Sequence, residues 1–294
     1  MTLFKGTATA LITPFRNEKI DYPAMGKLVE WQLKNGVDAL VVCGTTGEAS
    51  TLSGKERVQL THFVVDLVKG RVPVIAGTGS NNTSFTLELS KEMEEIGADG
   101  LLVVTPYYNK CTETGMISHY EKIADSVNIP IIMYSVKSRT GVNISPSAVK
   151  VLSEHPMIAG IKEASGDISQ ICEMARYISN DFSIYSGNDD MTVPIMSLGG
   201  LGCISTVSNI IPQQFSAMTH DYLEGNVKEA CRQQIALKPL IDAIFAEVNP
   251  IPLKAALNIM GMCELEYRLP LCPPTNKTQY LLYNVLREYD LVMK

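Results

Sequence analysis

Short apolar runs recur along the first two thirds of the chain. They are too short for helices, rich in residues that favour strands, and continuous rather than alternating, which is typical of strands covered on both faces. The runs span residues 7–13, 38–44, 72–77, 100–105, 129–134, 157–162, 182–187 and 202–207. We therefore predict eight parallel strands.

The segments between these runs carry apolar residues at helical spacing. Glycines end several of the predicted helices, and capping residues begin others. The signals are Gly36, Gly70 and Gly97 at the ends, and Ser53 with Glu56, Ser145 with Pro146 and Asp167 with Gln170 at the starts. Alternating strands and helices predict a (β/α)8 barrel over residues 1–224, followed by a C-terminal helical region over residues 225–294. An open doubly wound sheet is the alternative, but no GxGxxG motif follows the first strand.

Composition narrows the functional class. The 294-residue chain is 46% hydrophobic and 19% charged, with a net charge of −6 and no basic cluster, so a nucleic-acid or membrane surface has little electrostatic support. Small molecules are the expected partners. The N-terminal sequence lacks the apolar stretch of a signal peptide, and the seven scattered cysteines form no CxxC pair. We expect a cytoplasmic protein with free thiols.

Polar residues gather where the predicted strands end, which is where (β/α)8 barrels carry their chemistry. The segments are GTTGE (44–48), GTGSNN (77–82), TPYYNK (105–110), SVKSRTG (135–141) and SGNDD (186–190), with Tyr134 and Lys162 as the last residues of two runs.

Lys162 ends an apolar run that should be buried, and lysines are seldom buried without a partner or a function. It could extend out of the barrel and pair with Glu163 or Asp189. Alternatively, a pocket that disfavours charge would lower its pKa, so that the free amine attacks a carbonyl carbon and forms a Schiff base.

A Schiff-base mechanism also needs a group that moves protons. Tyr134 is the nearest candidate, and Thr45 with either Tyr107 or Tyr108 could complete a hydrogen-bond network. Each tyrosine could instead pack at the rim with its hydroxyl group satisfied.

Arg139 lies in a turn suited to binding a carboxylate, although a solvated loop arginine is the ordinary alternative. The four histidines show no HxH or HExxH spacing, and no P-loop or GxSxG motif occurs. We therefore expect neither a metal nor an organic cofactor.

The chain resembles the class I lyase and aldolase family of dihydrodipicolinate synthase and N-acetylneuraminate lyase. The resemblance rests on motifs in order along almost the whole chain: TALITPF, GTTGE, AGTGSNNT, TPYYN, SRTG, IKEASG, YSGND, NPIPLK and RLPL. GTTGE and the glutamate after Lys162 are similar to the dihydrodipicolinate synthase branch. That resemblance implies condensation of pyruvate with L-aspartate 4-semialdehyde, on the route to diaminopimelate and lysine.

The resemblance also implies roles for individual residues. Lys162 would form the Schiff base and Tyr134 would move the proton, with Thr45 and Tyr108 in the relay and Tyr108 supplied by a neighbouring subunit of a homotetramer built as a dimer of dimers. The substrate-binding residues would be Thr46, Arg139, and the backbone near Gly187 and Ile204.

The chain departs from the family pattern at a few positions. Ser135-Val136-Lys137 stands where Asn-Val-Pro is usual, and Cys111 replaces a common proline. Gly54, Arg57 and Phe85 occupy the positions at which strongly lysine-inhibited members carry basic and acidic side chains, so we predict weak or absent inhibition by lysine. Two other functions stay open: a pyruvate-dependent aldolase for another 2-oxo acid or sugar acid, and a non-catalytic sensor that binds an oxo acid.

Overall fold

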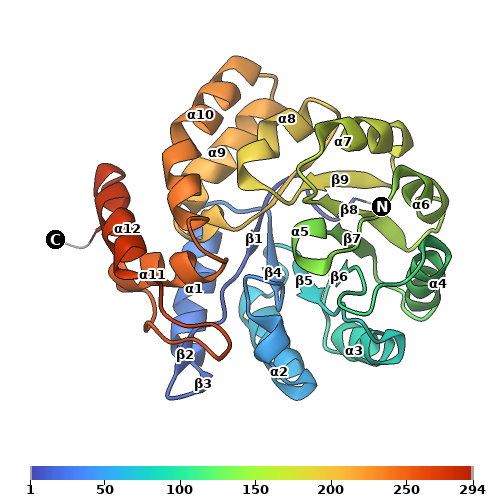
Figure 1. The fold of residues 1–294 in the computed structure, drawn as a ribbon, viewed down its shortest axis with the longest axis horizontal. Helices are drawn as coiled ribbons and strands as arrows, with labels where there is room; N and C mark the ends of the chain where they lie inside the picture. Colours follow the sequence, from blue (N-terminus) through green and yellow to red (C-terminus); the bar gives the residue numbers. More distant parts are fainter. Residues whose placement is uncertain (1, 293–294) are drawn as a thin grey trace.

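The predicted strands close into a single parallel barrel in the computed structural model, which describes residues 2–292 (Figure 1). The order around the barrel is β1-β10-β9-β8-β7-β6-β5-β4, and β1 pairs with both β10 and β4. The barrel is therefore confirmed and the open sheet is wrong. The strands are β1 Gly6–Ala10, β4 Ala39–Val42, β5 Val74–Gly77, β6 Gly100–Val104, β7 Ile131–Ser135, β8 Ile158–Glu163, β9 Ser183–Ser186 and β10 Gly202–Ser205.

Helices surround the barrel, as Figure 1 shows. Those of the barrel are α1 Tyr22–Lys34, α2 Gly54–Val68, α3 Thr83–Glu95, α4 Glu113–Ala124, α5 Lys137–Thr140, α6 Pro146–Leu152, α7 Ile168–Met174, α8 Thr192–Met196 and α9 Pro212–Leu223. The C-terminal helices are α10 Val227–Ile244, α11 Ile251–Ile259 and α12 Asn276–Glu288. Single 3-10 turns lie at η1 Ala49–Thr51, η2 Ala175–Tyr177, η3 Asp189–Met191 and η4 Val207–Asn209.

The predicted helix signals are present at the helix ends. Ser53 and Glu56 form a reciprocal capping box at the start of α2, and Ser145 and Asp167 cap α6 and α7. The helix-ending glycines Gly36, Gly70 and Gly97 have φ angles of 76°, 70° and 87°, which glycine adopts without steric cost.

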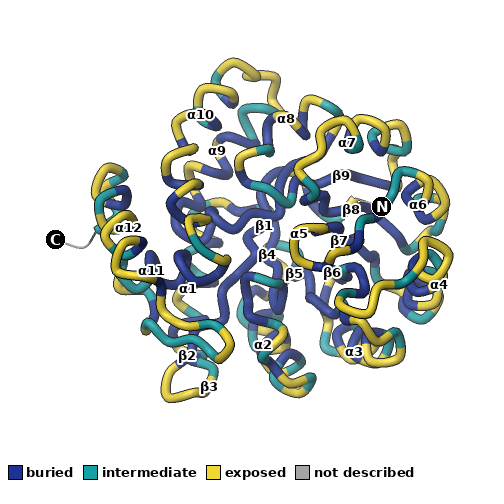
Figure 2. The backbone as a smooth tube through the Cα atoms, viewed as in Figure 1, coloured by how far each residue is buried: buried dark blue, intermediate teal, exposed yellow. Residues whose placement is uncertain are grey.

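Apolar side chains pack on both the inside and the outside of the barrel, and Figure 2 shows the barrel strands as mostly buried. Inside the barrel, residues such as Ala8, Ile75 and Ile132 form one buried cluster, which also contains Tyr134 and Ile204. Outside, three further clusters fill the space between the strands and the helices: one against β5 to β9, one against β4 and β5, and one against β10. Both faces of each strand are thus covered, which explains the continuous apolar runs of the sequence.

The C-terminal helices pack against the barrel. Ile12 and Cys203 of the barrel belong to the same buried cluster as Leu253 of α11 and Leu282 of α12. The boundary between residues 224 and 225 stays a prediction, and residues 1, 293 and 294 lie outside the described residues. A short hairpin of β2 Phe15–Arg16 and β3 Lys19–Ile20 lies outside the barrel sheet and was not predicted.

Candidate active site

Lys162 is buried inside the barrel near the end of β8. Its exposed fraction is 5%, and it lies in register with Tyr134 of β7 and Tyr185 of β9. The Lys162 Nζ atom lies 4.5 Å from the centroid of the Tyr134 ring. Within residues 2–292, no side-chain hydrogen bond or ion pair engages this amine. Lys162 is therefore not the solvent-reaching lysine of a surface ion pair.

The residue after Lys162 faces away from the barrel interior because side chains alternate along a strand. Glu163 is fully buried, and its carboxylate accepts a 2.6 Å hydrogen bond from the Ser165 backbone. Burial raises the pKa of this carboxyl group. Glu163 thus belongs to the outer packing of β8.

Gly187 leaves room beside the lysine. A Cβ atom at this position would lie 3.1 Å from Lys162 Cε and only 2.7 Å from the Ala164 side chain. Any larger residue would therefore press on the lysine stem. Ile204 of β10 is fully buried and belongs to the same interior cluster as Tyr134.

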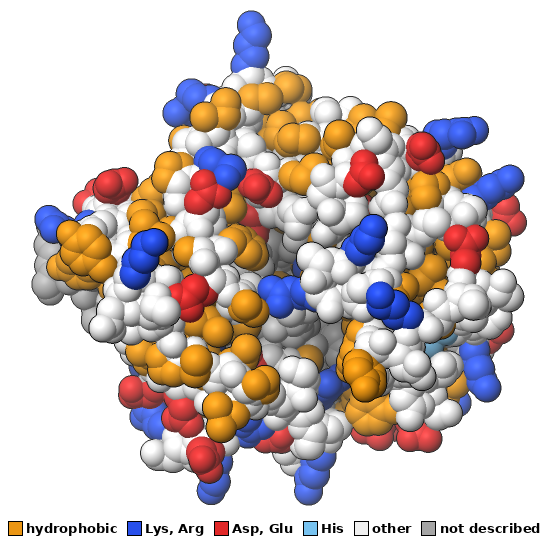
Figure 3. Space-filling model, in the orientation of Figure 1, with side chains coloured by type: hydrophobic (Ala, Val, Ile, Leu, Met, Phe, Trp, Pro, Cys, Tyr) orange, Lys and Arg blue, Asp and Glu red, His pale blue; other side chains and the backbone are white. Residues whose placement is uncertain are grey.

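A cavity of about 330 Å³ opens beside Tyr134 at the ends of the strands. Thr45, Tyr107 and Arg139 line it together with Tyr134. Figure 3 shows a hollow near the centre of this face, with basic side chains at its rim. Four elements of the chain thus bring the predicted threonine, tyrosines and arginine to a single cavity.

Thr46 follows Thr45 and is buried, and its hydroxyl group contacts two side chains. Its hydroxyl oxygen accepts a 3.0 Å hydrogen bond from the Asn249 amide and lies 3.4 Å from the Thr206 hydroxyl. Arg139 is exposed in the four-residue helix α5, which ends at Gly141 with φ 69°.

Tyr108 is not brought into the cavity of its own chain. It is 89% exposed, and its φ of 70° lies in the left-handed region that bulky residues seldom adopt. The neighbouring Tyr107 is half-buried and lines the cavity instead.

Asp189 is a further buried acid whose place the sequence did not reveal. Its carboxylate accepts hydrogen bonds from the Ser205 hydroxyl and, at 3.1 Å, from the Thr206 backbone. Burial raises the pKa of Asp189 to about 6, while its hydrogen bonds and the positive charge of Lys162 act in the opposite direction. The acidic pair in SGNDD was the available signal, but spacing alone could not say which acid is buried.

Two absences concern only the part of the chain that the structure describes. Between residues 2 and 292, no three His, Cys, Asp or Glu side chains gather in a group that could hold a metal ion. No helix in the same range is long and apolar enough to cross a membrane.

A family model described as the dihydrodipicolinate synthetase family matches residues 3–289. The chain belongs to this family. It is 50% identical over 293 residues to 4-hydroxy-tetrahydrodipicolinate synthase of Thermoanaerobacter sp. (strain X514), with 99% of each chain covered. Membership makes the protein a lyase of the class I aldolase type.

Solved structures of the family have the same fold. The dihydrodipicolinate synthase of Thermotoga maritima is 44% identical with a TM-score of 0.97, covering 99% of this chain and 100% of that one. The enzyme of Acinetobacter baumannii, complexed with pyruvate, is 37% identical with a TM-score of 0.96, covering 99% of this chain and 100% of that one.

Proposed function

We propose that the protein condenses pyruvate with L-aspartate 4-semialdehyde to 4-hydroxy-tetrahydrodipicolinate, in the biosynthesis of diaminopimelate and lysine. The observation that carries this proposal is the buried, unpaired amine of Lys162, 4.5 Å from the Tyr134 ring. The names of relatives about half identical over the whole chain support the choice of substrates.

Lys162 acts as the nucleophile in the first step. Its free amine adds to the C2 carbonyl carbon of pyruvate, and loss of water gives an imine. The Thr46 hydroxyl and the backbone near Gly187 and Ile204 hold the pyruvate carboxylate. The A. baumannii structure with pyruvate supports pyruvate as the first substrate.

Tyr134 moves protons in the steps that follow. The imine withdraws electrons, so a proton leaves C3 of the bound pyruvate and an enamine forms. The enamine carbon attacks the aldehyde of the semialdehyde, whose oxygen takes up a proton. The product contains a ring nitrogen, so the amino group of the second substrate displaces the lysine nitrogen. Thr45 and Tyr108 connect Tyr134 to solvent, and Arg139 binds the carboxylate of the semialdehyde.

The oligomer completes the relay in this proposal. Tyr108 is largely exposed and has an unfavourable backbone conformation. We therefore propose that its side chain enters the active site of a neighbouring subunit. We propose a homotetramer, built as a dimer of dimers, in the cytoplasm. All seven cysteines are free thiols, which supports a location in a reducing compartment.

Lysine is proposed to inhibit weakly or not at all. Arg57 is buried with its guanidinium 5.9 Å from the centroid of the Phe85 ring, and Gly54 contributes no side chain. These three residues offer no carboxylate to a lysine ammonium group. Inhibition by lysine in the low micromolar range would contradict this part of the proposal.

The test is turnover of the purified protein. Pyruvate and aspartate semialdehyde are supplied together, and the cyclic product is measured by coupling to its reduction. We expect saturable turnover that requires both substrates. Turnover with another aldehyde but not with the semialdehyde would favour an aldolase for a different acid, and pyruvate binding without any turnover would favour the sensor.

A further inference from the structure

We infer that the buried ion pair of Glu48 and Lys254, together with the Asn249 amide, positions the threonine loop of the active site. The threonine loop is Gly44–Glu48, the GTTGE motif. The inference rests on the proposed function, because it assigns a task to residues that support Thr45 and Thr46. It also gives a role to NPIPLK, a motif for which periodicity and spacing suggest none.

The threonine loop is a tight turn that its own backbone only partly holds. Glu48 N–H donates to the Thr45 carbonyl at 3.1 Å, and Gly47 N–H donates to the Gly44 carbonyl at 3.1 Å. Glu48 has a φ of 53°, a left-handed conformation that is unfavourable for residues other than glycine. Such a residue keeps this conformation only where surrounding contacts fix it.

The Glu48 side chain provides the strongest of these contacts. Its Oε1 atom lies 2.6 Å from Lys254 Nζ, and both side chains are fully buried. The Lys254 ammonium lies 4.2 Å from the centroid of the Phe15 ring and 5.2 Å from that of Tyr267. Burial lowers the pKa of Lys254, and the charge of Glu48 opposes that shift. An ion pair this deep fixes geometry because either charge alone would be poorly solvated.

Asn249 provides a second contact from the same motif. Its amide donates to the Thr46 hydroxyl oxygen at 3.0 Å. Asn249 and Lys254 lie on either side of the start of α11, so a single helix start places both against the threonine loop. The motif NPIPLK thus reaches two points of the same loop.

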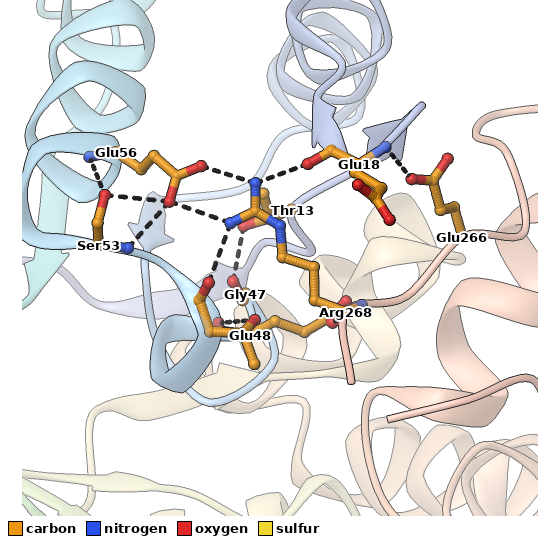
Figure 4. A network of polar contacts seen from close by, with 9 residues as sticks. Thr13, Glu18, Gly47, Glu48, Ser53, Glu56, Glu266 and Arg268 are labelled. Carbon is orange, nitrogen blue, oxygen red and sulfur yellow. Dashed lines mark hydrogen bonds and ion pairs between the residues drawn. The ribbon is translucent and has the colours of Figure 1, made fainter. Parts of the chain in front are cut away.

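Arg268 contacts Glu48 and the residues that follow it, and Figure 4 shows its guanidinium beside Glu56. Its backbone N–H donates to the other carboxylate oxygen of Glu48 at 3.3 Å. Its guanidinium bonds the Thr51 carbonyl at 2.9 Å and both carboxylate oxygens of Glu56 at 2.6 and 3.0 Å. Both Glu48 oxygens therefore have partners that come from the C-terminal segment.

The test uses variants that remove the positioning contacts without leaving a buried charge unpaired. The double variant E48Q/K254M replaces the ion pair by neutral side chains of similar size, which folded proteins often tolerate. The single variant N249A removes only the contact to Thr46. The control is T219V, which breaks a buried 2.9 Å hydrogen bond to Thr7 near the other end of the barrel.

Turnover, imine formation on Lys162 and thermal unfolding are measured for all variants. We expect E48Q/K254M and N249A to lose about tenfold or more in kcat, because small displacements of catalytic groups are costly. Imine formation on Lys162 should persist, since β8 is untouched. T219V, compared at similar unfolding temperature, should keep most of its activity.

The inference is overturned if N249A and the double variant turn over at the rate of the unmodified protein. It is also overturned if T219V loses as much activity at the same stability, because loss would then follow stability alone. If E48Q/K254M does not fold, N249A decides the result. An unmodified protein with neither imine nor turnover would overturn the proposed function itself.

Discussion

At the residue scale, the chemistry depends on an amine that the fold keeps out of ion pairs. The sequence predicted that Lys162 is buried. The barrel places Lys162 beside Tyr134, because the two residues are in register on adjacent parallel strands. Thr45 and Arg139 were predicted from their positions at strand ends, and they line the same cavity as Tyr134. Their catalytic roles stay predictions.

Tyr134→Phe is expected to lower kcat by about a hundredfold or more, because the ring stays packed while the proton-moving hydroxyl is lost. Steady-state kinetics measures the change. The matched control is Tyr289→Phe, which removes a hydroxyl that donates to the Ala236 carbonyl at 2.6 Å, between the end of α12 and α10. That variant should lose about 1 kcal/mol of stability and little activity. Equal activity losses in the two variants would contradict the role of Tyr134.

Asp189→Asn is expected to alter how stability depends on pH. Burial raises the pKa of Asp189 from 3.8 to about 6, so its contribution to stability is complete below pH 3.8 and is lost as the pH rises through 6. That shift corresponds to about 3 kcal/mol. The variant lacks this titration, so it should gain stability relative to the unmodified protein as the pH rises.

Thermal unfolding of both proteins between pH 4 and pH 8 measures the difference. The unfolding temperature of Asp189→Asn, relative to that of the unmodified protein, should rise by several degrees and level off above pH 7. A difference that does not change with pH would show that Asp189 has no raised pKa.

Some residues of the site could not be found from the sequence. Lys254 lies in an apolar helix, and its partner Glu48 is 206 residues away. A lone lysine in such a pattern signals burial, but it does not identify the group that it pairs with. Only the closed barrel brings the two side chains together.

At the scale of elements, the continuous apolar runs predicted the barrel strands, and the capping residues predicted where several helices begin. The β2–β3 hairpin could not be predicted, because strands of two residues have no periodicity to detect. Its turn also places Asn17 and Glu18 at φ 52° and 63°, without the glycine that marks such turns. Helix α5 was missed for a similar reason, since four residues are too few for a helical pattern.

Gly77→Ala is expected to disturb the threonine loop. A Cβ atom at Gly77 would lie 2.1 Å from the Cys43 carbonyl oxygen and 3.0 Å from the Gly44 nitrogen, so backbone would have to move. We expect a loss of several kcal/mol in stability and a large loss of turnover. Chemical unfolding and kinetics measure both.

The control for this substitution is Gly26→Ala in α1. There a Cβ atom would make only ordinary contacts at 3.7 and 3.8 Å, to Phe63 and Leu67. Alanine inside a helix should stabilise the protein by up to about 1 kcal/mol. If Gly77→Ala were equally harmless, the close packing of β5 against the threonine loop would be wrong.

At the scale of the whole molecule, the proposed oligomer predicts that two inactive variants rescue each other. Tyr108→Phe lacks the relay hydroxyl, and Lys162→Met lacks the nucleophile. In a mixed dimer, the subunit with Lys162 would receive an intact Tyr108 from its partner. Co-expressed subunits should therefore recover about a quarter of the unmodified activity, since about half the dimers are mixed and each has a single complete site.

Activity of the co-expressed pool measures the rescue, and tagged mixed dimers purified from it should have about half the unmodified activity, because one of their two sites is complete. Each variant expressed alone is the control and should stay nearly inactive. No recovery in the mixed dimer would mean that Tyr108 serves its own chain, and full activity of Tyr108→Phe alone would mean that Tyr108 takes no part in the relay.

The C-terminal helices pack against the barrel and also contribute residues that contact the threonine loop. They share a buried cluster with the barrel and carry Asn249 and Lys254 to the threonine loop. The pattern of the sequence predicted these helices, but it could not say that they reach the active site.

The most direct test of the account is to incubate the protein with pyruvate, reduce it with borohydride, and locate the added mass by peptide mapping. We expect a single adduct on Lys162 and none on Lys254, which is also buried but paired with Glu48. A folded protein that binds pyruvate and gives no adduct on Lys162 would contradict the Schiff-base mechanism and with it the proposed function.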